Sequence, residues 1–304
     1  MAGTYTAIDL SQLPPPQVVE VIDYEQILSE ILNDFYARMA ATGQPFTALV
    51  ESDPAYKLAE TAAYREMLVR QRANSSALAV MLAYATGSDL DQIGANVNLQ
   101  RLVLIPADPT TTPPTPEVME TDEAFRARIQ LVNESYTTAG SEGSYVFHAL
   151  SADANVKDVQ PVSPTPGQVV VYVLSNTGNG AADAPLLDKV AAALNAEEVR
   201  PLTDNVTVQS ASIIEYTITA ELVLYPGPDA TIILQAAKDE LQKYVNSTHR
   251  VGFDVTISGI YQALHRPGVQ TVNLTTPAST IVVNDGQAAY CTAMTVTAAG
   301  VPDV

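Results

Sequence analysis

The segment Ile214–Tyr225 reads IEYTITAELVLY and has the sharpest periodicity in the chain. Apolar side chains occupy alternate positions: Ile214, Tyr216, Ile218, Ala220, Leu222 and Leu224. Most of the positions between them carry Thr or Glu. Because the side chains of a strand alternate between two faces, this pattern predicts a long strand with one buried face and one exposed face. Pro226-Gly-Pro then predicts a turn into a helix over about Asp229–Asn246.

Helix-like and strand-like segments alternate on both sides of this strand. The pattern predicts an α+β fold in which an N-terminal helical region precedes two small α/β modules, each a sheet with helices on one face. The predicted domains are an N-terminal arm and helical region (1–105), a Pro-rich linker (106–121), a first module (122–212) and a second module (213–304). PADPTTTPPTP, from Pro106 to Pro116, predicts a stiff linker that is poor in hydrogen bonds.

A short similarity within the chain suggests an internal duplication. His148-Ala-Leu precedes Asn155–Pro164, much as Gln262-Ala-Leu precedes Gly268–Pro277, and a β-rich run follows each. Two related α/β units would explain the similarity. Coincidence of turn chemistry would explain it equally well.

Three helices are expected in the N-terminal region, the last of them a short helix that opens at Ser88-Asp-Leu-Asp91 and ends near Asn96. Asp23 is a predicted N-cap, and Asp53-Pro54 begins a second helix that meets no Pro or Gly before Gly87. The second half of this Pro54–Thr86 helix is apolar all round and must be covered on every side. The predicted contact residues on it are Leu58, Ala62, Val69, Ala73, Val80 and Tyr84. We expect an intermolecular bundle there; the alternative is one side of an ordinary helical core.

Charge excludes several function classes. The 304 residues carry 34 acidic and 15 basic side chains, a formal net charge of −19. Nucleic-acid and anionic membrane surfaces are bound through clustered Lys and Arg, so neither is an expected partner. The longest apolar run, Ala77–Ala85, is too short to span a bilayer. The opening residues do not resemble a secretory signal, and Cys291 is the only cysteine, which fits a reducing cytoplasm.

No expected catalytic, cofactor or metal site emerges. Ser175-Asn-Thr-Gly-Asn-Gly180 lies between a strand and a helix, as a dinucleotide-binding loop would, but Asp183 stands where a third glycine belongs. The flanking strands are expected to form hairpins rather than a parallel crossover. His148, His249 and His265 lack metal-ligand spacing. Cys291 is expected to be a small buried apolar residue.

Several stretches, taken together, resemble the baseplate J-like family of contractile-tailed bacteriophages. They are IDLSQLPPPQVVEVIDYE (Ile8–Glu25), AYREMLVRQRANSSALAVMLAYATGSDLDQIGA (Ala63–Ala95), TTPPTPEVMETDEAFRARIQL (Thr111–Leu131), VLSNTGNG (Val173–Gly180), EVRPLTDNVTVQSA (Glu198–Ala211), LYPGPDA (Leu224–Ala230) and STHRVGFDVTISGIYQALHRPGVQ (Ser247–Gln270). The resemblance therefore spans nearly the whole chain in order.

The resemblance implies a structural virion protein in the wedge of a tail baseplate, assembled in the cytoplasm of a host bacterium. It implies self-association as paired copies in a sixfold baseplate. The implied partners are a tail protein I-type wedge protein and a small wedge protein of lysozyme-like fold that contacts the sheath. The implied role is baseplate assembly and the coupling of its rearrangement to sheath contraction. Gly178, Asn179, Gly180, Arg200 and Pro201 belong to the family pattern and are expected to meet backbone and packing needs.

Two other function classes compete with this interpretation. An acidic α/β enzyme would use the Gly178–Gly180 loop to bind a nucleotide. A tail-fibre-like adhesin would show repetitive β-structure and trimerisation segments. Neighbouring genes for a tail sheath, a spike and other wedge proteins would distinguish a baseplate component from both.

Overall fold

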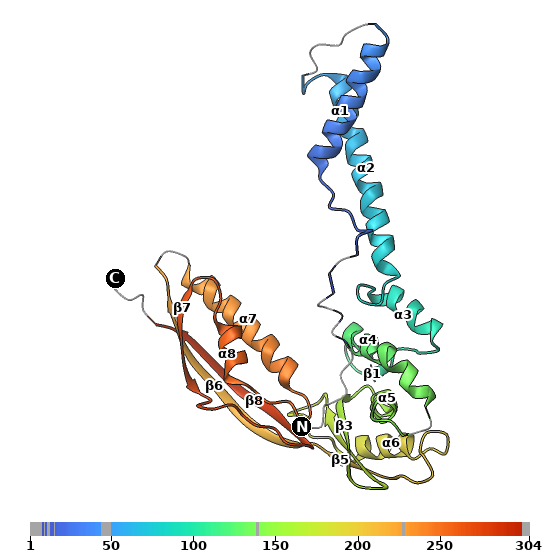
Figure 1. Cartoon of the computed structure of the whole chain (residues 1–304), viewed down its shortest axis with the longest axis vertical. Helices are drawn as coiled ribbons and strands as arrows, with labels where there is room; N and C mark the ends of the chain where they lie inside the picture. Colours follow the sequence, from blue (N-terminus) through green and yellow to red (C-terminus); the bar gives the residue numbers. More distant parts are fainter. Residues whose placement is uncertain are drawn as a thin grey trace. The chain divides into compact units, whose positions relative to one another are not determined.

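The computed structural model describes residues 8, 10, 13–14, 16–43, 50–137, 140–226 and 229–299. The described chain divides into two compact units. We call residues 8–100 the N-terminal unit and residues 101–299 the C-terminal unit. The α+β prediction is confirmed, since helices alone form the N-terminal unit's regular structure and helices pack on small sheets in the C-terminal unit (Figure 1).

The N-terminal unit contains α1 (Tyr24–Ala41), α2 (Pro54–Ala79) and α3 (Gly87–Asn96). Asp23 caps α1 by accepting hydrogen bonds from two backbone N–H groups of the first turn, and Asp53 caps α2 by accepting from the Ala55 N–H. α1 packs against the first half of α2. Ile27 and Leu28 of α1 and Ala63 of α2 form the buried core between them.

Helix α2 ends earlier than the sequence predicts. It stops at Ala79 instead of Thr86, and residues 80–86 make turns in which the Ala85 N–H donates to the Met81 carbonyl. Ala85 and Leu90 become buried where the chain turns towards α3. The helix propensity of residues 80–86, which include Met81, Leu82 and Ala83, is therefore overridden by burial, which no local start or stop signal announces.

The C-terminal unit begins with an antiparallel pair of short strands, β1 (Val103–Ile105) and β2 (Val118–Met119). The Pro-rich stretch closes this pair as a loop. The expectation that it is poor in hydrogen bonds is wrong, because Asp108 and Thr115 exchange two backbone hydrogen bonds and the Thr111 hydroxyl bonds within the loop. Helix α4 (Asp122–Leu131) and the 3-10 helix η2 (Val132–Tyr136) follow.

The first sheet has the strand order β3-β4-β5. Its elements are α5 (Glu142–Ala152), β3 (Val156–Thr165), β4 (Gln168–Ser175), α6 (Ala184–Leu194) and β5 (Asn205–Ser210). β3 and β4 pair antiparallel, whereas β4 and β5 pair parallel. Apolar side chains of α5 and α6 cover one face of this sheet, with Val171, Val173 and Val190 fully buried between the layers.

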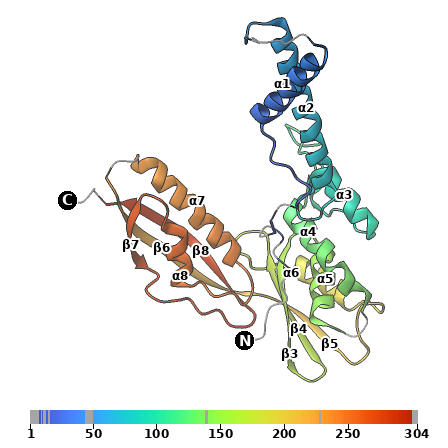
Figure 2. The same ribbon diagram turned by 45° about the horizontal axis from the view of Figure 1, so that its top comes forward.

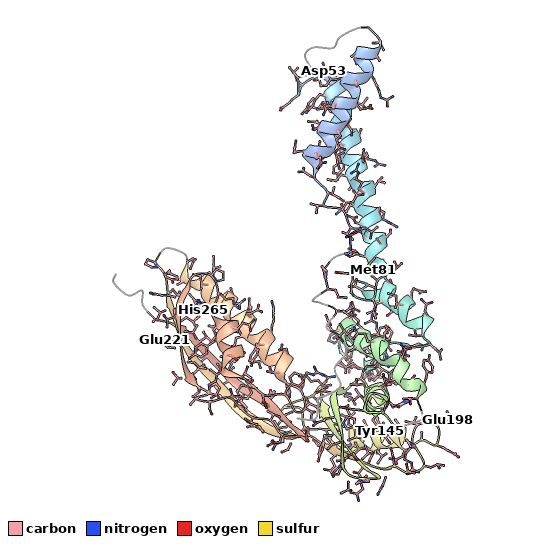
Figure 3. All side chains as sticks on the ribbon, in the orientation of Figure 1. Asp53, Met81, Tyr145, Glu198, Glu221 and His265 are labelled. Carbon is pink, nitrogen blue, oxygen red and sulfur yellow. The ribbon has the colours of Figure 1, made fainter. Side chains whose placement is uncertain are left out.

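The second sheet has the order β7-β6-β8. Its elements are β6 (Ser212–Leu224), α7 (Ala230–Thr248), α8 (Ile257–Leu264), β7 (Val269–Thr276) and β8 (Gln287–Ala298). Figure 2 shows α7 and α8 lying together on one face of the sheet. The predicted alternation of β6 is confirmed: Ile218 and Leu222 are fully buried under the helices, whereas Glu221, labelled in Figure 3, is exposed.

The two sheets share a pattern but not a connectivity. Each has a central strand with one antiparallel and one parallel neighbour. In the first sheet the two strands after α5 are neighbours, whereas β6 separates the two strands after α8. Between β7 and β8, Ile281 forms only an isolated bridge with Val255. The strand order therefore gives no support to a simple tandem duplication.

Candidate assembly surfaces

Four of the six predicted contact residues share one face of α2. Steps of four, seven and four residues separate Leu58, Ala62, Val69 and Ala73 along the chain. Steps of this size place residues on one side of a helix. All four are exposed, Leu58 by 72% and Val69 by 69%. We call these four residues, with Ser76 one turn further on, the α2 stripe. None of the described residues of the N-terminal unit covers this surface.

Val80 and Tyr84 lie outside the helix. Val80 follows the last residue of α2 and is 74% exposed. The Tyr84 hydroxyl donates to the Leu13 carbonyl oxygen at 2.9 Å, so its polar tip is engaged by the N-terminal arm of the same chain. The structure therefore does not place these two residues on the α2 stripe.

The N-terminal arm lies along the second half of α2. The Asn74 side-chain amide donates to the Glu20 carbonyl oxygen at 2.9 Å, and its oxygen accepts from the Glu20 N–H at 3.1 Å. This pair of bonds holds an extended backbone against the helix. Part of the apolar surface that the sequence assigns to a partner is thus covered within the chain itself.

Basic residues flank the α2 stripe. Arg65 and Arg72 are exposed and lie one helical step from the apolar positions. On the other flank, Arg70 forms an ion pair with Glu66 at 2.6 Å. A chain of net charge −19 thus presents a stripe with positively charged neighbours. Such a surface is complementary to an apolar helix flanked by carboxylates.

The glycine loop between β4 and α6 lies against residues of the second module. Gly178 and Gly180 have positive φ angles of 61° and 98°, a backbone region that glycine adopts without strain. A Cβ on Gly180 would lie 2.6 Å from Leu174 Cδ1 and 2.8 Å from His249 Nε2. The Asn179 side-chain oxygen accepts from the Ala181 N–H at 3.3 Å. These contacts give the loop a packing role.

One reason for rejecting a nucleotide site in this loop is wrong. β4, α6 and β5 form a parallel crossover, where the sequence analysis expected hairpins. Periodicity cannot distinguish strand direction, which the long-range pairing decides. The other reason stands, since Asp183 occupies the N-cap of α6 and accepts from the Leu186 N–H at 3.0 Å. A carboxylate at that position repels a phosphate.

Arg200 and Pro201 lie in the turn between α6 and β5. Arg200 is exposed, and its N–H donates to the Ala196 carbonyl oxygen at 3.0 Å. The Pro201 ring would lie 2.8 Å from a Cβ on Gly140, so a larger residue at position 140 would overlap it. The neighbouring Asp204 accepts from the Tyr145 hydroxyl at 2.7 Å, and burial with this bond raises the pKa of Tyr145.

Polar side chains of β3 join the two modules. Asp158 accepts from the Val251 N–H at 2.8 Å, and Gln160 bonds both Asp285 and the Gly286 N–H. The Lys157 ammonium donates to His249 Nδ1 at 2.9 Å. Burial, and next the positive charge of Lys157, lower the pKa of His249 to about 4. We call these contacts the module junction.

Sequence analysis missed the module junction. Its partners are separated by about ninety residues or more, and buried polar pairs leave no local pattern. The sequence analysis named only His249, for its lack of metal-ligand spacing, and the glycine loop that packs against it. Because Gln160 is 2% exposed and bonded at both ends of its amide, the junction fixes one arrangement of the two modules.

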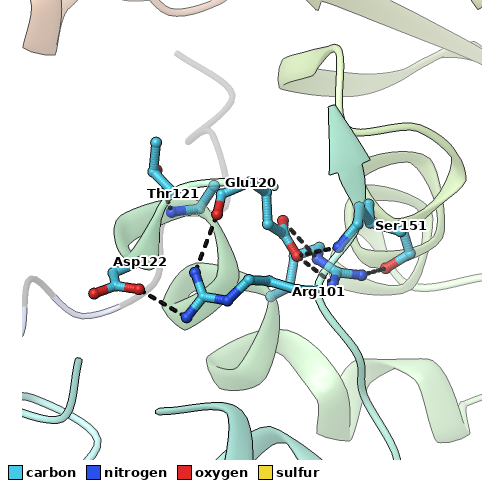
Figure 4. A network of polar contacts seen from close by, with 8 residues as sticks. Arg101, Glu120, Thr121, Asp122 and Ser151 are labelled. Atoms are coloured by element: carbon cyan, nitrogen blue, oxygen red, sulfur yellow. Dashed lines mark hydrogen bonds and ion pairs between the residues drawn. The ribbon is translucent and has the colours of Figure 1, made fainter. Parts of the chain in front are cut away.

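A buried ion pair anchors the start of the C-terminal unit. Arg128 of α4 and Glu120 lie 2.6 Å apart, and each side chain is 4% exposed. Figure 4 shows Glu120 within a network of polar contacts that also includes Arg101, Asp122 and Ser151. Glu120 also accepts from the Leu102 N–H, and Arg101 pairs with Asp122 at 2.7 Å. The network ties the strand pair β1–β2 to α4. It makes Arg101 part of the C-terminal unit.

The described residues contain neither a cluster of metal ligands nor a membrane-spanning helix. None of their His, Cys, Asp and Glu side chains form a group that could hold a metal ion. Within the same residues, no helix is both long and apolar enough to cross a bilayer.

The comparisons with known proteins agree along the chain. Models of the baseplate J-like N-terminal, central and C-terminal domains match residues 51–108, 137–210 and 216–297. The chain is also 49% identical over 296 residues to "Baseplate protein J" of Escherichia phage P2, an alignment that covers 96% of this chain and 98% of that protein. With this identity over nearly its full length, the chain belongs to the baseplate J-like family.

Proposed function

We propose that the chain is a structural component of a phage-tail baseplate, in an infectious phage or a related contractile particle, and that it has no catalytic role. The observation that carries this proposal is the 49% identity to Baseplate protein J over nearly the full length of both chains. An acidic, helix-and-sheet chain that leaves an apolar stripe exposed is consistent with a subunit that works through contacts.

The proposed contacts are with a second copy of the chain, with a tail protein I-type wedge protein and with a small sheath-contacting wedge protein. The α2 stripe supports the first two, because an exposed apolar helix face flanked by Arg65 and Arg72 fits an intermolecular helix bundle. Arg200, Pro201 and the glycine loop keep their proposed role in shaping the C-terminal unit.

The proposed role in contraction is mechanical. A subunit that passes a rearrangement from its neighbours to the sheath must move as a stiff body rather than deform internally. The module junction and the Arg128–Glu120 pair provide that stiffness in the C-terminal unit, because buried charged and amide groups tolerate few alternative partners. We propose that force enters or leaves through the N-terminal unit.

The test is co-purification from cells that express the chain with the two wedge proteins. Residues 101–304 should fold, because Arg101 keeps its bonds to the Glu120 carbonyl and to Asp122. This fragment should lose the wedge complex that the full chain forms. Circular dichroism of the fragment verifies that it is folded. If a folded fragment still forms the same complexes, the assembly surface lies in the α/β modules, and the proposal for the N-terminal unit is wrong.

A further inference from the structure

Two basic side chains face each other across the module junction. The Lys157 Nζ of β3 lies 2.9 Å from Nδ1 of His249, the C-cap residue of α7. The ammonium has only donors, so Nδ1 accepts, and a neutral His249 must carry its proton on Nε2. Among the described residues, no carboxylate bonds this ring. A second proton on His249 would therefore set one positive charge directly against another.

The other neighbours of the His249 ring leave it little room. Tyr290 of β8 packs beside it, with ring centroids 5.3 Å apart, and its phenol is uncharged in acid. On the glycine loop, a Cβ at Gly180 would lie 2.8 Å from Nε2, and Nε2 itself is buried without a hydrogen-bond partner. His249 as a whole is 8% exposed. The imidazole is thus held between β3, β8 and the glycine loop, close to Lys157.

The charged groups around this pair of bases have partners of their own. Asp158, the next residue of β3, accepts from the Val251 N–H at 2.8 Å and pairs with Arg250 at 3.5 Å. From β8, the Cys291 thiol lies in the same pocket as the imidazole and is uncharged in acid. The glycine loop carries no titratable side chain. Acid therefore adds a charge at His249 without adding a partner for it.

The imidazole adjoins a pocket through which water can supply the proton. His249 lines this pocket of about 350 Å³ together with Tyr290–Met294 of β8 and the last turns of α7. Burial, and next the charge of Lys157, lower the pKa of His249 to about 4, and the Asn179 backbone opposes both effects. A histidine released from the junction would titrate near its ordinary pKa of about 6.5. Because the open form takes up the proton more readily, acid favours opening.

We propose that the Lys157–His249 contact is an acid-sensitive switch, which closes the module junction while His249 is neutral and releases it when His249 is protonated. The neutral ring binds the ammonium and packs against Gly180. The imidazolium repels the ammonium and turns out to water, so the end of α7 separates from β3 and from the glycine loop. Each module keeps its own core, since the clusters under α5–α6 and α7–α8 contain neither of the two bases.

The direction of the pH dependence follows from the groups involved. The stability that His249 gives the closed junction is fully present above about pH 6.5 and is lost as the pH falls towards about 4. Asp158 acts in the opposite direction, because burial raises its pKa and the folded protein takes up this proton before the unfolded chain does. A variant that changes only His249 therefore separates the two effects.

Hydrogen exchange of the full-length protein at about pH 7 and about pH 5 tests the switch. The Val251 and Gly286 amides report on the junction, since they donate across it to Asp158 and Gln160. After correction for the intrinsic effect of pH on exchange, their protection should fall about thirtyfold at the lower pH, the ratio given by pKa values of about 6.5 and about 4. The amides of Ile218–Leu222 in the central strand β6 are the internal control and should keep their protection.

Two variants identify the titrating group. His249→Asn retains an oxygen that can accept from Lys157 but does not titrate, so the junction amides should be equally protected at both pH values. Lys157→Met keeps the apolar stem without the ammonium, and should reduce the acid-induced loss at least about threefold, which also tests the switch if the Asn variant does not fold. Junction protection that is unchanged by pH in the unaltered protein, or that falls equally in either variant, would overturn the switch. An equal loss in β6 would mean global unfolding and would also contradict it.

Discussion

Helix α2 and strand β6 distribute their apolar side chains in opposite ways. Among the 26 residues of α2, Ala63 is the one that the N-terminal unit buries completely, whereas the α2 stripe faces solvent. β6 has 13 residues and buries Tyr216, Ile218, Ala220, Leu222 and Leu224 in a core shared with α7 and α8. The C-terminal unit is therefore stabilised from within. In the N-terminal unit, the apolar α2 stripe remains exposed among the described residues.

This difference has an energetic consequence. Burying a large aliphatic side chain contributes roughly 1.5–3 kcal/mol, so the cluster of buried side chains around β6 contributes strongly to the stability of the C-terminal unit. The α1–α2 contact rests on far fewer buried residues. Substitutions in the C-terminal unit should mainly change the free energy of unfolding, and substitutions on the α2 stripe should mainly change association.

The largest effect is expected at the centre of β6. Ile218 is fully buried, so Ile218→Asp removes apolar burial and places a carboxyl group where it has no partner. The loss should exceed about 5 kcal/mol in the free energy of unfolding. Thr217→Asp, the adjacent exposed position, should cost well under 1 kcal/mol. Urea denaturation followed by circular dichroism measures both, and similar losses would show that the strand's faces are assigned wrongly.

The next effect tests the anchor of the C-terminal unit. Arg128→Ala leaves the Glu120 carboxylate buried without its ion pair, which should cost about 3–5 kcal/mol. Lys243→Ala is the matched control, because it removes an exposed ion pair with Glu240 and should change stability by less than about 1 kcal/mol. Chemical denaturation of both variants distinguishes the two. A small effect at Arg128 would mean that Glu120 finds another partner.

A smaller and more local effect is expected in the N-terminal unit. Leu28→Ala removes one of three buried residues between α1 and α2 and should cost about 2–3 kcal/mol. Hydrogen exchange should show the loss in residues 24–79 while the C-terminal unit keeps its protection. The control is Leu58→Ala, at a position 72% exposed, which should leave exchange unchanged. Loss of protection across both units would show that they unfold together.

The glycine loop should give the smallest loss of stability. A Cβ at Gly180 would overlap Leu174 and His249 and would also adopt a positive φ, so Gly180→Ala should cost about 2 kcal/mol. In Gly178→Ala the new Cβ has open space around it, so only the positive φ should destabilise the protein, by about 1 kcal/mol in the free energy of unfolding. Thermal unfolding compares the two. Equal losses would remove the packing role assigned to Gly180.

The sequence predicts those elements whose signals are local. The alternation in β6, and the start of α2 at Asp53 and Pro54, follow from residues within one or two turns of each element. The end of α2 could not be predicted, because burial of Ala85 and the Tyr84–Leu13 contact decide it. The parallel pairing of β4 and β5 and the bonds of Gln160 are long-range, so periodicity carries no information about them.

The proposed contact surface was predictable in part for the same reason. Leu58, Ala62, Val69 and Ala73 lie within a regular helix, where spacing alone determines the face. Val80 and Tyr84 were assigned by extending that helix beyond its observed end. The position of β8 at one edge of the second sheet could not be anticipated, because strand order follows from contacts across the whole second module.

The most direct test of the α2 stripe is the mass of the full-length protein, measured by light scattering after size exclusion, with and without co-expressed wedge partners. Val69→Asp places a charge in the centre of the stripe, and Gln71→Asp places one elsewhere on the exposed surface of the same helix. Both positions are exposed, so neither variant should change the melting temperature appreciably. The account predicts that Val69→Asp loses the assemblies that the unaltered protein and Gln71→Asp form. Assemblies of unchanged mass in Val69→Asp would contradict it.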